Sequence, residues 1–94
     1  MARAIVLTRG YRRSLARLGI KTGSPRGRRV GATVGRIADA EELPAPGDVE
    51  ATIPPTHAAY VRRVRNENLW VWYMLRGSHV WAVAVTPHPP VPTD

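Results

Sequence analysis

The strongest hydrophobic pattern in the chain lies near its C-terminal end. Residues 69–75 (LWVWYML) are apolar at every position and rich in β-branched and aromatic side chains, which is typical of a central strand. The next four residues, RGSH, contain a glycine that can adopt positive φ, and residues 80–86 continue as a second apolar run. These features predict a β-hairpin.

The turn of this hairpin fixes which side chains share a face. A loop of Gly77 and Ser78 places Leu75 opposite Val80. The same register places Trp72 opposite Val83. One face then carries side chains that helices can pack against: Leu69, Val71, Tyr73, Leu75, Val80, Ala82 and Ala84. The other face is rich in tryptophan and has no obvious cover: Trp70, Trp72, Met74, Trp81, Val83 and Val85.

A third strand is expected at residues 60–65, and the loop after it decides which way its side chains point. A two-residue loop of Glu67 and Asn68 places Arg63 and Arg65 beside the tryptophans, where arginine over indole contributes about 0.5–2 kcal/mol. It places two residues on the helix side: Arg62 and Val64. A three-residue loop would bury two arginines beneath the helices, so we prefer the shorter loop.

The N-terminal part predicts one strand and two helices. Residues 4–8 (AIVLT) form a short apolar run that suits an edge strand beside the hairpin. From Arg9 the apolar residues take helical spacing until Gly19 ends the helix. Ser24 and Pro25 then supply a cap and a first residue for a second helix. Its apolar stripe is Val30, Val34, Ile37 and Ala38.

The second helix contains three glycines, each of which costs about 1 kcal/mol relative to alanine. Gly31 and Gly35 are four residues apart and share one face. Two interpretations stay open: the glycines permit close approach to the first helix or the sheet, or the helix is loosely packed and ordered by a partner.

Residues 39–50 hold five of the seven acidic residues and several prolines, so they predict a loop. The loop continues to Thr56, because Pro54 and Pro55 exclude a central strand. We expect a single domain at residues 1–86 and a proline-rich end at residues 87–94. The order strand, helix, helix, loop and three strands predicts an α+β fold, with two N-terminal helices packed on one face of a small antiparallel sheet.

Charge points to the kind of partner. The 94 residues carry fourteen basic and seven acidic side chains, a formal net charge of +7, and thirteen of the basic residues are arginine. This excess favours a polyanionic partner, either nucleic acid or an acidic protein. The alternative is that arginine reflects a GC-rich genome and merely solvates the surface.

Several classes of chemistry are disfavoured by composition. The chain has no cysteine, and His57, His79 and His88 lack the spacing of a zinc site, so we expect no metal and no cofactor. No segment approaches the length of about 18–20 apolar residues that spans a bilayer, and the N-terminus has no signal-peptide core. We therefore expect a cytoplasmic protein.

Two segments carry a family resemblance. ARAIVLTRGYRRSLARLG, residues 2–19, resembles the first strand and basic first helix of the RelE/ParE superfamily of type II toxin–antitoxin toxins. AYVRRVRNENLWVWYMLRGSHVWAVAV, residues 59–85, resembles its last three strands, with Tyr73 in the middle of the central one. Leu43 and Pro44 resemble the Leu-Pro of the YafQ-like branch. The resemblance implies the order β-α-α-β-β-β and a bacterial mRNA interferase that acts at the ribosome and is neutralised by an acidic cognate antitoxin.

The resemblance also implies roles for particular residues. His88 falls at the C-terminal histidine of the YafQ-like and YoeB-like branches, where it would transfer protons during RNA cleavage. Arg63 and Arg65 would stabilise the phosphorane charge, completing the expected catalytic set. The expected RNA-binding residues are Arg12, Arg13, Trp70 and Trp72, the tryptophans because aromatic rings stack on bases for about 1–3 kcal/mol each.

The chain departs from the family pattern in ways that keep other functions open. Trp70 stands where the RelE branch often has an arginine, Val61 replaces the earlier basic residue of the preceding strand, and Pro89 follows His88. One alternative is a ParE-type inhibitor of DNA gyrase without catalytic residues. Another is an inactive basic module that binds RNA or protein. An open tryptophan face would support a bound partner under either toxin function.

Overall fold

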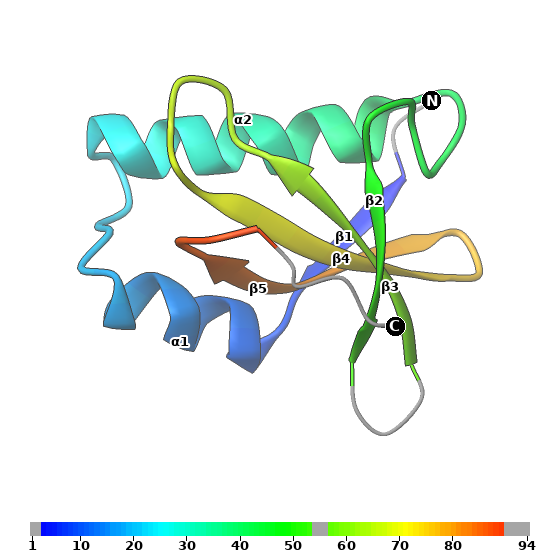
Figure 1. The fold of residues 1–94 in the computed structure, drawn as a ribbon, viewed down its shortest axis with the longest axis horizontal. Coiled ribbons are helices and arrows are strands. Elements are labelled where there is room, and N and C mark those ends of the chain that lie inside the picture. Colours follow the sequence, from blue (N-terminus) through cyan, green and yellow to red (C-terminus); the bar gives the residue numbers. More distant parts are fainter. Residues whose placement is uncertain (1–2, 54–56, 90–94) are drawn as a thin grey trace.

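Two helices and a five-stranded sheet make up the protein (Figure 1). The computed structural model describes residues 3–53 and 57–89. Along the chain the elements are β1 (Ala4–Leu7), α1 (Arg9–Arg17), α2 (Pro25–Asp39), β2 (Val49–Ile53), β3 (His57–Arg63), β4 (Trp70–Arg76) and β5 (His79–Thr86). The expected α+β class is confirmed, although the chain has one strand more than we predicted.

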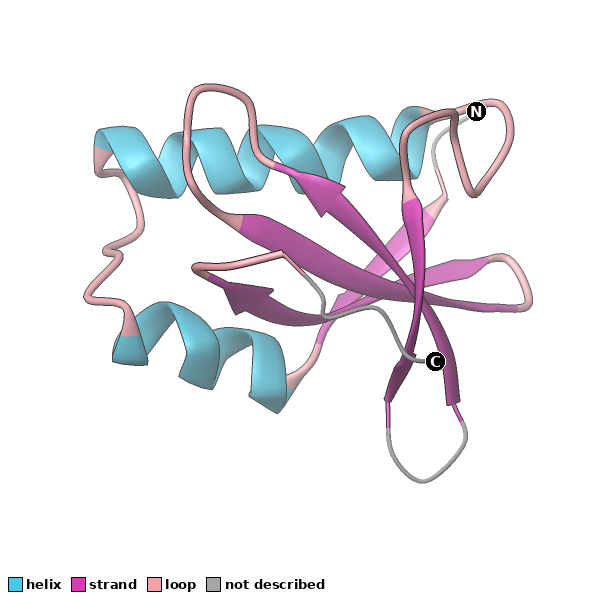
Figure 2. Cartoon of the chain, viewed as in Figure 1, coloured by secondary structure: helices cyan, strands magenta, loops and turns pink. Residues whose placement is uncertain are grey.

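The strands lie in the order β1-β5-β4-β3-β2. β1 runs parallel to β5, so the prediction of an antiparallel sheet was wrong at this edge, while the other neighbours are antiparallel. In Figure 2 the β2–β3 hairpin crosses the β4–β5 hairpin steeply, as expected for a strongly twisted sheet. β1 is therefore an edge strand beside the C-terminal hairpin, as predicted.

β2 is the strand that the sequence analysis missed. It pairs with β3 from Val49 opposite Val61 to Ile53 opposite His57. Because β2 forms the other edge of the sheet, proline beside it removes no ladder hydrogen bond from the sheet interior. The prolines exclude a central strand but not this edge strand, so the prediction of a continuous loop was wrong. Pro54 and Pro55 lie outside the described residues.

The β4–β5 hairpin has the predicted turn, with Leu75 opposite Val80. The register then shifts between Tyr73, which faces Ala82, and Trp72, which faces Ala84. Val83 is thus the extra residue of a β-bulge, and the expected pairing of Trp72 with Val83 is wrong.

The bulge exchanges the faces of the residues that follow it. Val85 lies opposite Val71 and is buried in the core, with 3% of its surface exposed. Ala84 lies opposite Trp72 and joins the tryptophan face. The predicted positions of both residues are therefore reversed, because an inserted residue inverts the alternation of side chains along a strand.

The loop between β3 and β4 is longer than predicted. Arg63 pairs with Trp70, and the Val64 N–H donates to the Leu69 carbonyl at 2.8 Å, which leaves a loop of residues 65–68. The shift of two residues preserves the predicted faces, so Arg62 stays on the helix side. Arg65 lies in the loop and not on the strand, so its expected place beside a tryptophan is wrong.

Both helices begin where the sequence predicts. The Thr8 hydroxyl oxygen accepts a hydrogen bond from the Tyr11 N–H, and the Ser24 hydroxyl oxygen accepts one from the Gly27 N–H at 3.0 Å. One core cluster joins the helices to a single face of the sheet: Tyr11, Ile20, Val30, Val34, Ile37, Val64, Leu69, Val71, Tyr73, Val80, Ala82 and Val85. The predicted stripe of α2 is buried throughout. Two helices on one face are thus confirmed.

The glycines of α2 have different surroundings. A Cβ atom on Gly27 would lie 2.3 Å from the Lys21 carbonyl oxygen, so this position requires glycine. A Cβ atom on Gly31 or Gly35 would have no atom within 4 Å. Close approach by the helix or sheet therefore does not explain these two glycines, and that interpretation was wrong.

Candidate nucleic-acid interface

Three neighbouring strands place one residue each in a row across the sheet face that carries no helix. Trp70 of β4 lies opposite Arg63 of β3 on one side and Thr86 of β5 on the other. The Arg63 guanidinium carbon lies 5.8 Å from the centre of the Trp70 ring. We call this row, with His88 two residues beyond Thr86, the open-face row.

A short chain of hydrogen bonds holds the C-terminal stretch against the sheet. Trp72 Nε1 donates to Thr86 Oγ1 at 3.0 Å, and Thr86 Oγ1 donates to the His88 carbonyl at 2.9 Å. The His88 side chain itself is exposed. The backbone of His88 is therefore fixed at the same end of the sheet as Arg63, while its imidazole is open to solvent.

The tryptophans are half-buried, whereas we expected this face to be open. An apolar hollow of about 360 Å³ lies between β2 and the bulged part of β5, and its lining is Thr52, Ile53, Trp72, Val83, Ala84 and Thr86. Because β2 and β5 are not neighbours in the sheet, the sheet must curl to bring them to one hollow. At the other end of the face, the Arg76 guanidinium lies 5.2 Å from the centre of the Trp81 ring.

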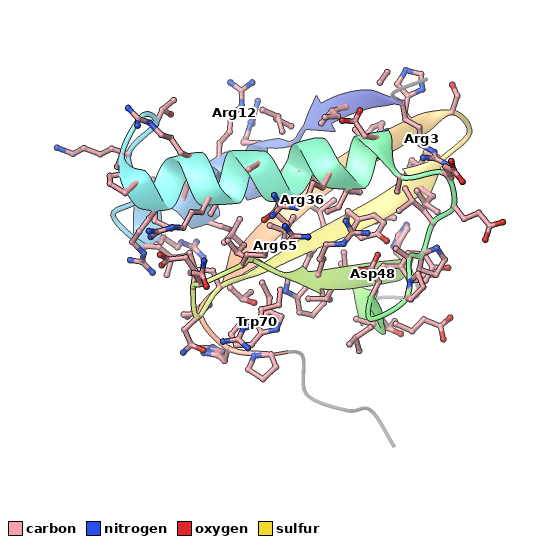
Figure 3. All side chains as sticks on the ribbon, turned by 90° about the horizontal axis from the view of Figure 1, so that it is seen from above. Arg3, Arg12, Arg36, Asp48, Arg65 and Trp70 are labelled. Carbon is pink, nitrogen blue, oxygen red and sulfur yellow. The ribbon has the colours of Figure 1, made fainter. Side chains whose placement is uncertain are left out.

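The expected RNA-binding arginines of α1 are not part of the open-face row. Arg12 and Arg13 are exposed on a helix that packs against the other face of the sheet. In Figure 3, Arg12 and Trp70 lie at opposite edges of the molecule. The structure thus brings together Arg63, Trp70, Trp72 and the His88 backbone, and leaves Arg12 and Arg13 apart from them.

A second basic cluster lies at the edge of β3. The ladder with β2 ends at Val49 opposite Val61, so no β2 residue covers the last residues of β3. A pocket of about 360 Å³ opens there between α2 and the turn before β2, lined by Arg36, Ala40, Ala45, Pro46, Gly47, Asp48, Arg62, Arg63 and Arg65. Figure 3 shows Arg36 and Arg65 close together between the helix and the sheet. We call this cluster the arginine pocket.

The wall of the arginine pocket contains a partly buried ion pair. Arg62 donates from Nε to Asp48 Oδ1 at 2.7 Å and from Nη2 to Oδ2 at 2.9 Å. Tyr73 Oη and the Ala45 N–H also donate to Asp48 Oδ2. The Asp48 side chain is only 2% exposed, so four donors replace the water that it loses.

This network sets the charges of its members. Burial acts to raise the pKa of Asp48, but the hydrogen bonds from Arg62 and Tyr73 together outweigh it, so the pKa lies below the usual aspartate range. Burial, reinforced by the Asp48 carboxylate, raises the pKa of Tyr73. Asp48 is therefore ionised and Tyr73 is a neutral donor at neutral pH.

A second carboxylate orients the loop that carries Arg65. Glu67 accepts hydrogen bonds from Arg26 Nε at 3.0 Å and from Arg29 Nη1, both on α2. Partial burial of Glu67 opposes ionisation, yet these two arginines hold its pKa below the usual glutamate range. The loop is thus tied to the first half of α2.

Sequence reasoning missed the importance of Asp48 and Arg62. A signal was present, because Arg62 and Tyr73 were both expected on the helix side of the sheet, where polar groups need partners. The acidic segment before β2 was the obvious source of such a partner, but treating that segment as an unstructured loop concealed it.

Comparisons of the chain with protein-family models, curated proteins and solved structures gave no match. Within residues 3–53 and 57–89, no three His, Cys, Asp or Glu side chains gather as a metal site would require. No helix in the described part of the chain is long and apolar enough to cross a membrane.

Proposed function

We propose that the protein is a bacterial, cytoplasmic toxin of the RelE/ParE type that cleaves mRNA at the ribosome without a metal or cofactor. The observation that supports this most is the open-face row. Its register puts a cation, an aromatic ring and the strand end that leads to His88 across three adjacent strands. A proton carrier, a cation for the phosphorane charge and a ring that stacks on a base each assist cleavage of a single-stranded RNA.

Each member of the row has a chemical task in this proposal. The His88 imidazole takes the proton of the ribose 2′-hydroxyl as its oxygen attacks the phosphorus, and water protonates the 5′-oxygen as its bond to phosphorus breaks. With the roles exchanged, water takes the first proton and the imidazolium gives the second. Arg63 stabilises the charge that develops on the phosphorus oxygens. Its Nε donates to the Glu67 carbonyl at 3.4 Å, which keeps the guanidinium above Trp70. Trp70 and Trp72 stack on bases beside the cleaved bond.

The cognate antitoxin has a suitable docking surface at the opposite edge of the sheet. Ile5 and Leu7 of β1 are 38% and 42% exposed and border an apolar groove with Tyr11, Gly31, Val34 and Gly35. The glycines leave this groove open, and α1, which carries Tyr11 of its lining, also carries exposed arginines such as Arg12. An acidic amphipathic segment of the antitoxin fits both the apolar floor and the basic surroundings.

A ParE-type gyrase inhibitor is the second candidate, and one observation favours it. Trp70 stands where an arginine is common in the nuclease branch, and Arg65 lines the arginine pocket. Arg63 is therefore the single arginine of the open-face row. A protein that inhibits gyrase needs no catalytic set. An inactive basic module that binds RNA or protein is compatible with the same feature.

The experiment is to add the purified protein to a cell-free translation reaction and map the 5′ ends of the mRNA. New cuts inside translated codons support the nuclease. Intact mRNA together with inhibition of gyrase supercoiling in a parallel assay would overturn the nuclease function in favour of the gyrase inhibitor. Intact mRNA with both translation and gyrase unaffected would leave the inactive module.

A further inference from the structure

The arginine pocket carries more positive charge than its own carboxylate can neutralise. Its lining holds four arginines and one aspartate, and both oxygens of that aspartate are occupied by Arg62. Among the described residues, the ion pairs are those of Arg26, Arg29 and Arg62. Arg36 and Arg65 therefore border the pocket without a carboxylate partner in this part of the chain.

Arg36 and Arg65 come from separate elements and border one space, whereas Arg63 borders it with its guanidinium turned to Trp70. Arg36 lies on α2, where its Nη2 donates to Thr33 Oγ1 at 3.1 Å. Arg63 ends β3, and Arg65 lies in the loop that Glu67 ties to α2. Neighbouring guanidinium groups repel one another, and a bound anion offsets this repulsion.

The geometry of the donors favours a phosphate group. Each guanidinium presents a planar fork of N–H donors, and a phosphate offers three terminal oxygens to accept them. Arg62 lines the same wall, but Asp48 neutralises its charge, so Arg36 and Arg65 are the arginines left to bind the anion. The lining contains alanine, proline and glycine but no aromatic ring that would stack on a base.

We propose that the arginine pocket binds a phosphate dianion, either as the free ion or as the terminal phosphate of an oligonucleotide. The pocket lies at the edge of β3 on the side of α2, whereas the tryptophans lie on the opposite face of the sheet. Arg63 borders the pocket, but its guanidinium lies over Trp70 on the open face. Binding of phosphate here does not depend on RNA cleavage, so the proposal stands or falls separately from the proposed function.

The test is titration calorimetry of the whole chain with inorganic phosphate and with a short RNA that carries either a 5′-phosphate or a 5′-hydroxyl. Arg36→Gln and Arg65→Gln should each weaken phosphate binding by about 10-fold, the effect of losing one charged hydrogen bond. Arg28→Gln is the matched control, because Arg28 is exposed on the same helix and does not line the pocket. It should change the affinity by less than about threefold.

The two sources of phosphate give different results, and both support the pocket. Tighter binding of the 5′-phosphate RNA than of the 5′-hydroxyl RNA identifies an oligonucleotide end as the ligand, because both RNAs share the same backbone charge. Binding of inorganic phosphate, together with equal binding of the two RNAs, identifies the free ion. The proposal is overturned if inorganic phosphate does not bind and the two RNAs bind alike, or if Arg28→Gln weakens binding as much as Arg36→Gln. Thermal unfolding of each variant without phosphate shows that the pocket variants remain folded.

Discussion

Tyr73 donates a hydrogen bond of 2.5 Å to Asp48, a residue 25 positions earlier in the chain. Tyr73 is fully buried in the middle of β4, and Asp48 immediately precedes β2 at the sheet edge. The same carboxylate accepts two hydrogen bonds from Arg62 of β3. One side chain thus connects the central strand, the neighbouring strand and the turn that starts the edge strand.

Asp48→Asn should destabilise the protein by about 3 kcal/mol. The substitution leaves the mostly buried Arg62 guanidinium without its counter-charge, and removing one member of a buried pair costs more than the pair contributes. Urea unfolding at neutral pH measures the change. Glu50→Gln, at an exposed position of β2, is the control and should stay within about 0.5 kcal/mol of the unsubstituted chain. A loss below about 1 kcal/mol for Asp48→Asn would contradict the account of the network.

Stability should fall in acid because of the same carboxylate. The pKa of folded Asp48 lies below the ordinary value of 3.8, so the folded state binds fewer protons than the unfolded state in this range. The contribution of Asp48 is therefore complete above pH 3.8 and is lost as the pH falls through the folded pKa.

Urea midpoints between about pH 6 and about pH 2 test this pH dependence. Asp48→Asn should show a shallower decline than the unsubstituted chain. Glu67 contributes in the same direction, since Arg26 and Arg29 lower its pKa, so the comparison is best made in a Glu67→Gln background. Parallel curves with and without Asp48 would show that its ionisation is not linked to folding.

Two glycines of α2 should respond oppositely to alanine. Gly27→Ala should destabilise the protein, because the new methyl group would lie 2.3 Å from the Lys21 carbonyl oxygen. Gly31→Ala should stabilise it by about 0.5–1 kcal/mol, since the Cβ meets nothing within 4 Å and alanine favours the helix. Thermal unfolding of the two variants compares them directly. Changes of the same sign in the two variants would contradict the different surroundings of Gly27 and Gly31.

Thr86→Val tests the link between Trp72 and the C-terminal stretch. Valine keeps the shape of threonine but removes the hydroxyl that joins Trp72 Nε1 to the His88 carbonyl. We expect a loss of about 1 kcal/mol in stability. Under the proposed nuclease function, we also expect cleavage to fall by about 10-fold, because His88 loses its position while its imidazole is unchanged. Full cleavage by Thr86→Val would show that this link does not position His88.

The sequence was sufficient for the elements whose signals are local. Ser24 marks the start of α2, the tight turn at Gly77 marks the β4–β5 hairpin, and the apolar stripe of α2 identifies its buried side. Caps, turns and periodicity act over a few residues, so they are readable without knowledge of the fold. The α+β fold class and the packing of both helices on one face of the sheet followed from these local signals.

The remaining features depend on contacts between distant segments. β2 consists of a mixed sequence, VEATI, that becomes a strand because β3 offers it an edge. The bulge at Val83 lies where the first turn of α1 meets β5: Thr8 donates to the Ala82 carbonyl, and a Cβ atom on Gly10 would approach the Val83 carbonyl at 2.9 Å. The arginine pocket likewise joins residues of α2, β3 and the following loop. None of these relationships has a signature within one segment.

The most direct test of the proposed function compares His88→Ala with His79→Ala in the translation reaction described above. Both histidines are exposed, but His79 lies at the far end of β5, away from the open-face row. We predict that His88→Ala weakens cleavage inside translated codons by about 100-fold, the range of general acid–base catalysis, and that His79→Ala leaves it unchanged. Equal cleavage by the two variants, or no cleavage by the unsubstituted chain, would contradict the assignment of RNA chemistry to the open-face row.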